Sequence, residues 1–85
     1  MKRVANSVAV ETVCYTISGD QHIRIVNYKS DWDLFRREHG EIVFEGKEKD
    51  FYGYKYSEVR RSKVCGLSTD GDTLVFVIAT VFDEY

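Results

Sequence analysis

Two cysteines and two histidines are the residues of this chain best suited to metal binding or nucleophilic catalysis: Cys14, Cys65, His22 and His39. Zinc sites take such side chains from closely spaced motifs, and a catalytic thiolate needs a base or a helix N-terminus beside it. The four residues fall on four separate predicted elements, and neither cysteine begins a predicted helix. The sequence therefore predicts no catalytic residue, no metal site and no cofactor, and it leaves open whether the two cysteines are bridged.

A second group of residues could act by stacking and charge. Three tyrosines alternate along residues 51–59, and alternation places side chains on one face of a strand. Two arginines follow them closely, near Lys63. Such a face could stack the bases of single-stranded nucleic acid, or it could bind protein, since Tyr and Arg are enriched at interface hot spots. The set comprises Tyr52, Tyr54, Tyr56, Arg60 and Arg61.

Acidic residues dominate the end of the chain. All twelve basic residues lie at or before Lys63, and four acidic residues follow it: Asp70, Asp72, Asp83 and Glu84. We expect these acids to form an acidic edge that could occupy the phosphate-binding surface of a nucleic-acid enzyme. The alternative is a solvated, slightly acidic face without a binding role.

The elements that must position these residues begin with the last one. Residues 73–82 (TLVFVIATVF) are apolar on both parities, whereas a half-buried strand alternates apolar and polar residues. A strand that is apolar on both faces must be covered on both faces. Closure into a barrel, a loop layer or a second molecule could supply the second cover.

The other elements follow from local signals. Ser30 as N-cap, Asp31 and Asp33 in the first turn and Gly40 at the end predict a helix over 30–40. We expect its packing side to comprise Trp32, Leu34, Phe35 and the stem of Glu38 or His39. Asp70-Gly71 between apolar runs predicts a hairpin. We expect further strands at 6–18 and 21–28, joined as a hairpin, at 41–46 and at 63–68. Tyrosine content favours a strand at 51–59, although a helix stays open there.

The order of these elements, β-β-α-β-β-β-β, predicts an α+β fold. We expect a mainly antiparallel, strongly bent sheet or small open barrel of five to six strands with one short helix. A homodimer that pairs sheet faces is the competing arrangement.

Bulk properties set the remaining limits. Residues 1–85 make one domain, with a net charge of −2 and 44% hydrophobic residues. The basic start is not followed by a continuous apolar run, and no stretch approaches the length of a membrane span. A cytoplasmic protein is expected, in the host cell if the chain comes from a phage.

Two functions from different classes fit these features. The favoured interpretation is a small non-enzymatic protein-binding module, an inhibitor of a larger nucleic-acid-handling enzyme of the anti-CRISPR or anti-defence type. Size and composition of this kind are typical of phage and mobile-element proteins. Its partner would be a larger protein or a nucleoprotein complex. The alternative is a single-stranded nucleic-acid-binding protein that uses the tyrosine and arginine face, and the negative net charge counts against it.

Overall fold

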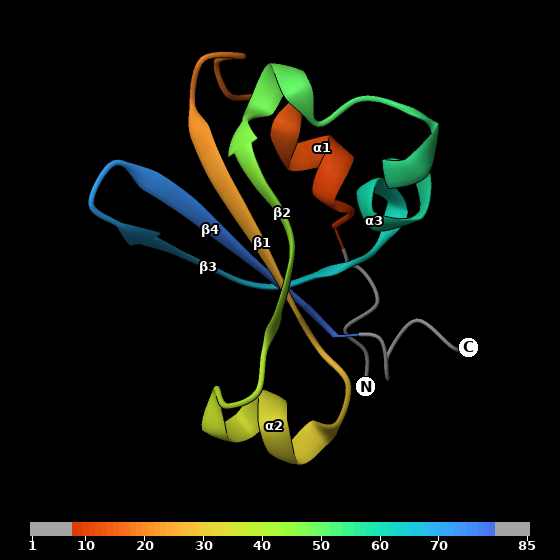
Figure 1. Ribbon diagram of the computed structural model, residues 1–85, viewed down its shortest axis with the longest axis vertical. Coiled ribbons are helices and arrows are strands. Elements are labelled where there is room, and N and C mark those ends of the chain that lie inside the picture. The colour runs from red at the N-terminus through yellow and green to blue at the C-terminus, as the bar shows by residue number, and fades with distance from the viewer. Residues whose placement is uncertain (1–7, 80–85) are drawn as a thin grey trace.

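The computed structural model describes residues 8–79 of the chain. Four strands and several short helices make up this part (Figure 1). The strands are β1 His22–Tyr28, β2 Glu41–Lys47, β3 Val64–Asp70 and β4 Thr73–Ala79. The α-helices are α1 Val10–Cys14, α2 Asp31–Arg36 and α3 Ser57–Arg61, and the 3-10 helices are η2 Glu48–Asp50 and η3 Tyr54–Tyr56.

The strands form one open, mixed sheet in the order β2-β1-β4-β3. The outer pairs, β1 with β2 and β3 with β4, are antiparallel, but the central pair of β1 and β4 is parallel. The α+β class is therefore confirmed. The expected five to six strands and the barrel-like closure are not: the described residues hold four strands, and the sheet is open.

The hairpin of β3 and β4 is confirmed. Asp70 pairs with Thr73, so Gly71 and Asp72 form a two-residue turn. Gly71 has a φ of 63°, a left-handed conformation that glycine adopts without steric cost.

The main core lies between one sheet face and the layer that contains α1, α3, η2 and η3 (Figure 1). Ile23, Ile25 and Phe76 are fully buried on that sheet face. Val10 of α1 and Phe51, between η2 and η3, are buried against them at 0% and 1% exposure. This side thus carries most of the apolar burial that stabilises the fold.

The opposite sheet face is covered differently. Tyr28 of β1 and Val77 and Ala79 of β4 are also buried, so β4 is buried on both faces over its second half, as its sequence predicts. The α2 helix lies at this end of the molecule (Figure 1), and the loop after it packs on β1. Among the described residues the sheet is not closed into a barrel, and the loop after α2 packs on this face at Val26 and Tyr28.

The strand predicted over residues 6–18 is wrong for its described part, residues 8–18. They form the α1 helix and a turn. Val10, Val13, Cys14 and Ile17 recur at the spacing of a helix, and all four pack in or against the core cluster. The apolar residues of this segment therefore follow a helical period and not the alternation of a strand. The predicted hairpin of 6–18 with 21–28 is therefore also wrong.

The strand interpretation of 51–59 is wrong as well. Gly53, with a φ of 139°, precedes η3 and then α3. Tyr56 and Val59 lie three residues apart and pack against the core cluster, as one helical face would. The ambiguity left by the sequence resolves as helix.

The helix predicted over 30–40 begins as expected and ends early. The side chain of Ser30 accepts a hydrogen bond from the backbone N–H of Asp33 at 3.1 Å. The helix ends at Arg36 because Arg37 adopts a left-handed conformation with a φ of 57°. Gly40 is thus not the helix cap; it lies on β1, where a Cβ atom would come 2.5 Å from Cγ1 of Val26.

Within residues 8–79, no helix is long and apolar enough to cross a membrane.

Candidate protein-binding face

The α2 helix presents one side to solvent. In a helix of about 3.6 residues per turn, positions 31, 32, 35 and 36 share a side, and positions 33 and 34 lie on the other. The exposures follow this division, since Asp33 and Leu34 are half-buried and the other four are exposed. We call the exposed set, Asp31, Trp32, Phe35 and Arg36, the α2 face.

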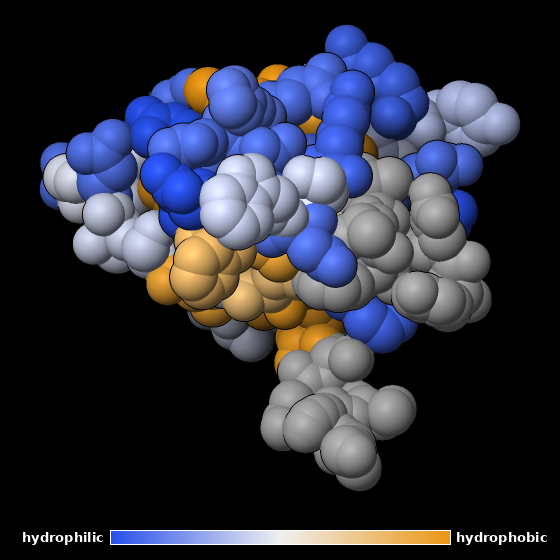
Figure 2. Space-filling model, turned by 90° about the horizontal axis from the view of Figure 1, so that it is seen from below, coloured by the Kyte–Doolittle hydropathy of each residue, from blue (hydrophilic) through white to orange (hydrophobic). Residues whose placement is uncertain are grey.

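Two large aromatic rings dominate the α2 face. Trp32 is 62% exposed and Phe35 is 79% exposed, and no residue of α2 is buried. Their ring centroids lie 6.3 Å apart, and the guanidinium of Arg36 lies 5.3 Å from the centre of the Trp32 ring. Ring contacts and cation–π attraction therefore hold these side chains together on the surface. Viewed from the α2 end, the molecule shows apolar colour gathered in one patch that borders polar residues (Figure 2).

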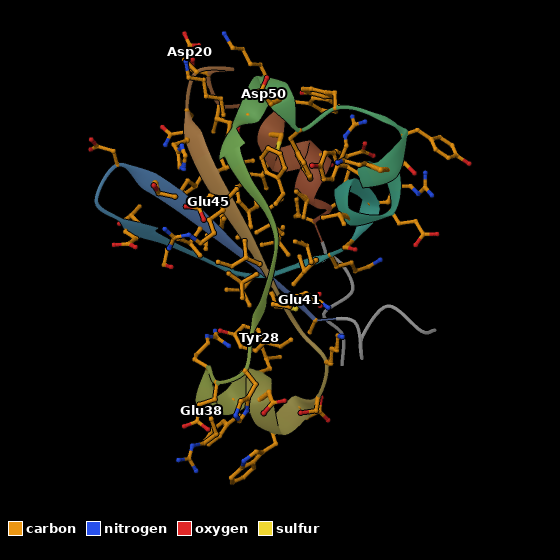
Figure 3. The ribbon with its side chains drawn as sticks, viewed as in Figure 1. Asp20, Tyr28, Glu38, Glu41, Glu45 and Asp50 are labelled. Carbon is orange, nitrogen blue, oxygen red and sulfur yellow. The ribbon has the colours of Figure 1, made fainter. Side chains whose placement is uncertain are left out.

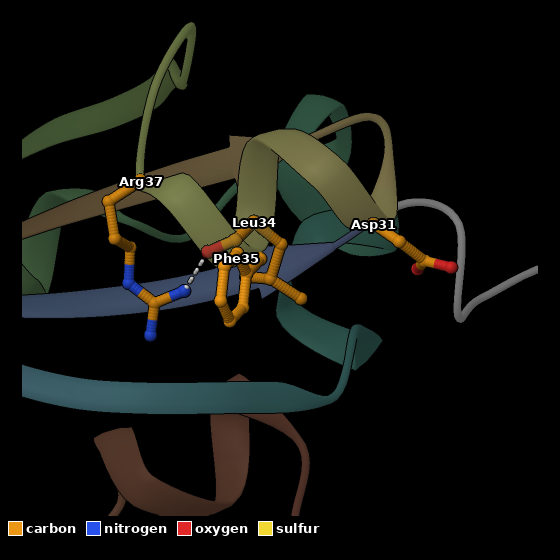
Figure 4. A pocket seen from close by; sticks show the side chains of 4 residues that line it. All are labelled: Asp31, Leu34, Phe35 and Arg37. Carbon is orange, nitrogen blue, oxygen red and sulfur yellow. Dashed lines mark hydrogen bonds between the residues drawn. The ribbon is translucent and has the colours of Figure 1, made fainter.

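An open cavity of about 560 Å³ lies beside these rings, lined by Asp31, Leu34, Phe35 and Arg37 (Figure 4). The guanidinium of Arg37 donates a hydrogen bond to the backbone carbonyl of Leu34 and lies 5.8 Å from the centre of the Tyr28 ring. Arg37 is thus held as a wall of the cavity by the helix end on one side and by β1 on the other.

An ion pair stabilises the loop that follows α2. Nδ1 of His39 lies 3.1 Å from Oδ1 of Asp33. This hydrogen bond raises the pKa of His39 above 6.5 and lowers the pKa of Asp33 below 3.8. His39 has a φ of 62°, so two non-glycine residues of this loop, His39 and Arg37, are left-handed. The pair helps to hold this unusual backbone in place.

The three tyrosines predicted as one face are separated by the structure. The Tyr56 ring packs inward, 5.1 Å from the ring of Phe44 and 5.4 Å from that of Phe51. Tyr54 is 95% exposed. The hydroxyl of Tyr52 donates to the buried carboxylate of Glu48 at 2.5 Å. They share no face because the segment is helical rather than extended.

The two arginines predicted to accompany the tyrosines also differ. Arg60 stacks 4.6 Å from the centre of the Tyr52 ring and forms an ion pair with Glu11 at 3.4 Å. Arg61 is exposed. The structure therefore brings Arg60 and Tyr52 together in one network of contacts, in which Arg60 pairs with Glu11 and Tyr52 with Glu48. Tyr54 and Arg61 lie outside this network.

Cys14, which lies near Glu48, Arg60 and Glu11, and Tyr52 are both unsuited to nucleophilic or acid–base chemistry near neutral pH. Burial, and then the charge of Glu48, raises the pKa of Cys14 to about 11. The hydrogen bond to Glu48 raises the pKa of Tyr52 to about 12. Both groups are held protonated, whereas a reactive thiol or phenol needs a lowered pKa.

The other cysteine, Cys65, is exposed rather than buried, and no disulfide joins it to Cys14. Across residues 8–79, no cluster of three or more His, Cys, Asp or Glu side chains could hold a metal ion.

The predicted acidic edge is described only in part. Asp70 forms an ion pair with Arg24 at 3.0 Å, and Arg24 is shared with Glu45 at 3.1 Å. Asp72 lies in the exposed turn of the hairpin, where its carbonyl accepts a hydrogen bond from Gln21. Asp83 and Glu84 lie outside the described residues. The hairpin stands on the other side of the molecule from α3 (Figure 1), so Asp70 and Asp72 do not share a site with the tyrosines.

Sequence reasoning missed the α2 face because it assigned Trp32, Leu34 and Phe35 together to the packing side of the helix. The three cannot share a side, since Trp32 and Leu34 are two positions apart on a helix. Figure 3 shows where this helix lies: Tyr28 stands at the end of the sheet beside α2 and Glu38 at the far end of the molecule, away from Asp20 and Asp50. Spacing alone could have separated Leu34 from the two aromatic residues.

No protein family, curated protein or solved structure matches the chain.

Proposed function

We propose that the protein is a non-enzymatic protein-binding module and that the α2 face is its binding surface. One observation carries the proposal: a tryptophan and a phenylalanine are mostly exposed on a helix that buries no residue. Exposed apolar clusters rimmed by polar residues mark interaction sites, and Trp and Arg are the residue types most enriched at binding hot spots.

The cavity beside the α2 face supports the same proposal. Binding hot spots pair a projecting anchor with a pocket that a partner's anchor fills. Here the anchor, Trp32, lies on the same short helix as Asp31, Leu34 and Phe35, which with Arg37 line the open cavity of about 560 Å³. One partner surface could therefore engage both.

Site-specific photo-crosslinking tests the proposal. A photoreactive phenylalanine analogue replaces Phe35 in one variant and Tyr54 in a control variant, because both native rings are strongly exposed, at 79% and 95%. We expect polypeptide adducts from position 35 and few from position 54. Polypeptide adducts from position 54 alone would contradict the α2 face as the binding surface.

The narrower function, inhibition of a nucleic-acid-handling enzyme through the acidic residues, is a proposal that rests on chain size and charge order. Its test neutralises Asp70, Asp72, Asp83 and Glu84 together as amides. Unchanged binding to the partner enzyme would contradict it.

Single-stranded nucleic-acid binding has less support, since Tyr56 packs inward and Arg60 pairs with Glu11. Tyr52, Tyr54 and Arg61 are the exposed members of that predicted set, and Tyr52 is already stacked with Arg60, so such binding could still use Tyr54 and Arg61. Nucleic-acid adducts from position 54 in the same crosslinking experiment would favour this alternative.

A further inference from the structure

The α2 face carries opposite charges at its two ends. Asp31 is the first residue of the helix and Arg36 is the last, and the rings of Trp32 and Phe35 lie between them. The face therefore runs from an acid, across an apolar centre, to a base.

Such an arrangement is complementary to itself. A two-fold axis through the middle of the face, perpendicular to the line from Asp31 to Arg36, exchanges the two ends. Each Asp31 then faces Arg36 of a second copy, and the aromatic pair of one copy lies on that of the other. Closed dimers are built on this kind of isologous contact.

We propose that the occupant of the α2 face is a second copy of this chain, bound by two crossing α2 helices. This inference rests on the proposed function and names the partner of the same surface. It differs from the dimer expected from the sequence, which would have paired sheet faces.

The charged residues of α2 that could compete for this contact are already engaged elsewhere. The carboxylate of Asp33 pairs with His39 at 3.1 Å, and the backbone N–H of Asp33 donates to the N-cap side chain of Ser30. Arg37 is bound to the carbonyl of Leu34. Arg36 lies 5.3 Å from the centre of the Trp32 ring and has one loose ion pair, with Glu38 at 3.7 Å; exposed ion pairs of this kind contribute little. Arg36 can therefore pair with an acid of another molecule without giving up a strong ion pair.

The position of α2 allows a second copy to approach. The helix lies at one end of the longest axis of the molecule, beyond the crossing strands of the sheet (Figure 1). It is six residues long, so two antiparallel α2 helices set Asp31 of each copy opposite Arg36 of the other over a short contact. The contact is small, and we expect a weak dimer rather than an obligate one.

Charge reversal with mixing tests the dimer. Sedimentation equilibrium measures the wild type, Asp31→Arg, Arg36→Glu, and an equal mixture of the two variants. Each variant alone would set like charges opposite each other twice, which we expect to weaken association at least about tenfold. In a mixed dimer both contacts join opposite charges, so the mixture should recover most of the association. Asp50→Arg, a charge reversal at an exposed acid at the end of the molecule opposite α2 (Figure 3), is the matched control and should associate like the wild type.

Recovery on mixing also excludes a trivial loss of folding, because two variants with a broken helix could not restore each other. A wild type that is monomeric at the highest measurable concentration would overturn the proposal. Variants that each associate like the wild type, or a mixture that does not recover, would also overturn it.

The proposed function and this inference can fail separately. A monomeric wild type whose position 35 crosslinks to a different polypeptide would keep the α2 face as the binding surface and overturn only the second copy. A monomeric wild type without polypeptide adducts from position 35 would overturn both.

Discussion

Two helical regions of the molecule, the layer of α1 and α3 and the α2 helix, differ in the burial of their apolar residues. On the side of α1 and α3, Val10 and Phe51 are 0% and 1% exposed, and the helices pack against the sheet. At the other end, α2 has no buried residue, and its rings point outward at 62% and 79% exposure. One short helix stabilises the fold, while another of nearly the same length leaves its largest side chains in water.

Under the proposed function, this difference separates the residues that stabilise the fold from those that bind a partner. A short helix has little stability of its own, so packing usually holds it. The α2 helix is held instead by its cap at Ser30, by the ion pair of Asp33 with His39, and by Gly40 against β1. These polar and loop contacts leave the aromatic residues of α2 available to a partner.

The comparison is tested most strongly by removing one phenylalanine from each side. Phe51→Ala should lower the free energy of unfolding by about 3–5 kcal/mol, since it leaves a cavity in the core. Phe35→Ala should change it by less than about 0.5 kcal/mol, as expected for a surface site. Urea denaturation, followed by circular dichroism at a protein concentration low enough to keep the chain monomeric, measures both. Equal losses would show that α2 belongs to the stabilising core.

The next effect concerns the loop that fixes α2 to the sheet. Gly40→Ala would place a Cβ atom 2.5 Å from Cγ1 of Val26 and 2.9 Å from Cε1 of Tyr28. We expect the free energy of unfolding to fall by about 1–3 kcal/mol from this overpacking. Gly66→Ala is the matched control, because its Cβ would meet the nearest atom at an ordinary 3.5 Å. A Gly40 variant as stable as the Gly66 variant would mean that the loop does not pack tightly on β1.

A smaller effect should follow from loss of the helix cap. Ser30→Ala removes the acceptor of the Asp33 backbone N–H and should cost about 1 kcal/mol. Ser68→Ala, at an exposed position of β3, should cost almost nothing. Thermal unfolding of both variants beside the wild type gives the difference. Similar midpoints for both would indicate that contacts other than the cap determine where α2 begins.

The smallest effect is a dependence on pH. The pKa of His39 is raised from 6.5 by Asp33, so its contribution to stability is fully present below 6.5 and is lost as the pH rises through the folded pKa. The pKa of Asp33 is lowered from 3.8, so its contribution is lost as the pH falls through the folded value. The pair should therefore stabilise the loop most between pH 3.8 and pH 6.5, the ordinary pKa values of the two side chains.

His39→Asn, which suits the left-handed backbone, serves as the comparison for this pH dependence. We expect the wild type to lose stability relative to the variant as the pH rises past 6.5. Thermal midpoints measured across that range give the difference. Parallel pH profiles would show that the ion pair does not stabilise the loop in solution.

Local signals in the sequence predicted the parts of the fold that depend on neighbouring residues. Asp70-Gly71 gave the correct hairpin, and Ser30 with Asp31 and Asp33 gave the correct start of α2. The burial of β4 on both of its faces also followed from composition. Alternate residues of a strand face opposite ways, and every residue from Phe76 to Ala79 is apolar.

The remaining features depend on contacts that local patterns do not contain. Val10, Val13, Cys14 and Ile17 fit a helix, but Val13, Cys14 and Ile17 lie in a segment that also fits a strand, and their packing in or against the core cluster decides between the two. Trp32 was expected on the packing side of the predicted helix. Its exposure follows from which side of a two-turn helix meets the sheet, and this depends on Gly40 and Arg37.

Trp32 also provides the most direct measurement, because it is the only tryptophan in the chain. Its fluorescence emission, recorded over a wide dilution series of the wild type, reports whether another molecule covers the α2 face. We predict emission at shorter wavelength in concentrated solution, a shift to longer wavelength on dilution, and loss of this shift in Arg36→Glu. Emission typical of a water-exposed indole at every concentration would contradict the claim that a second copy covers this face.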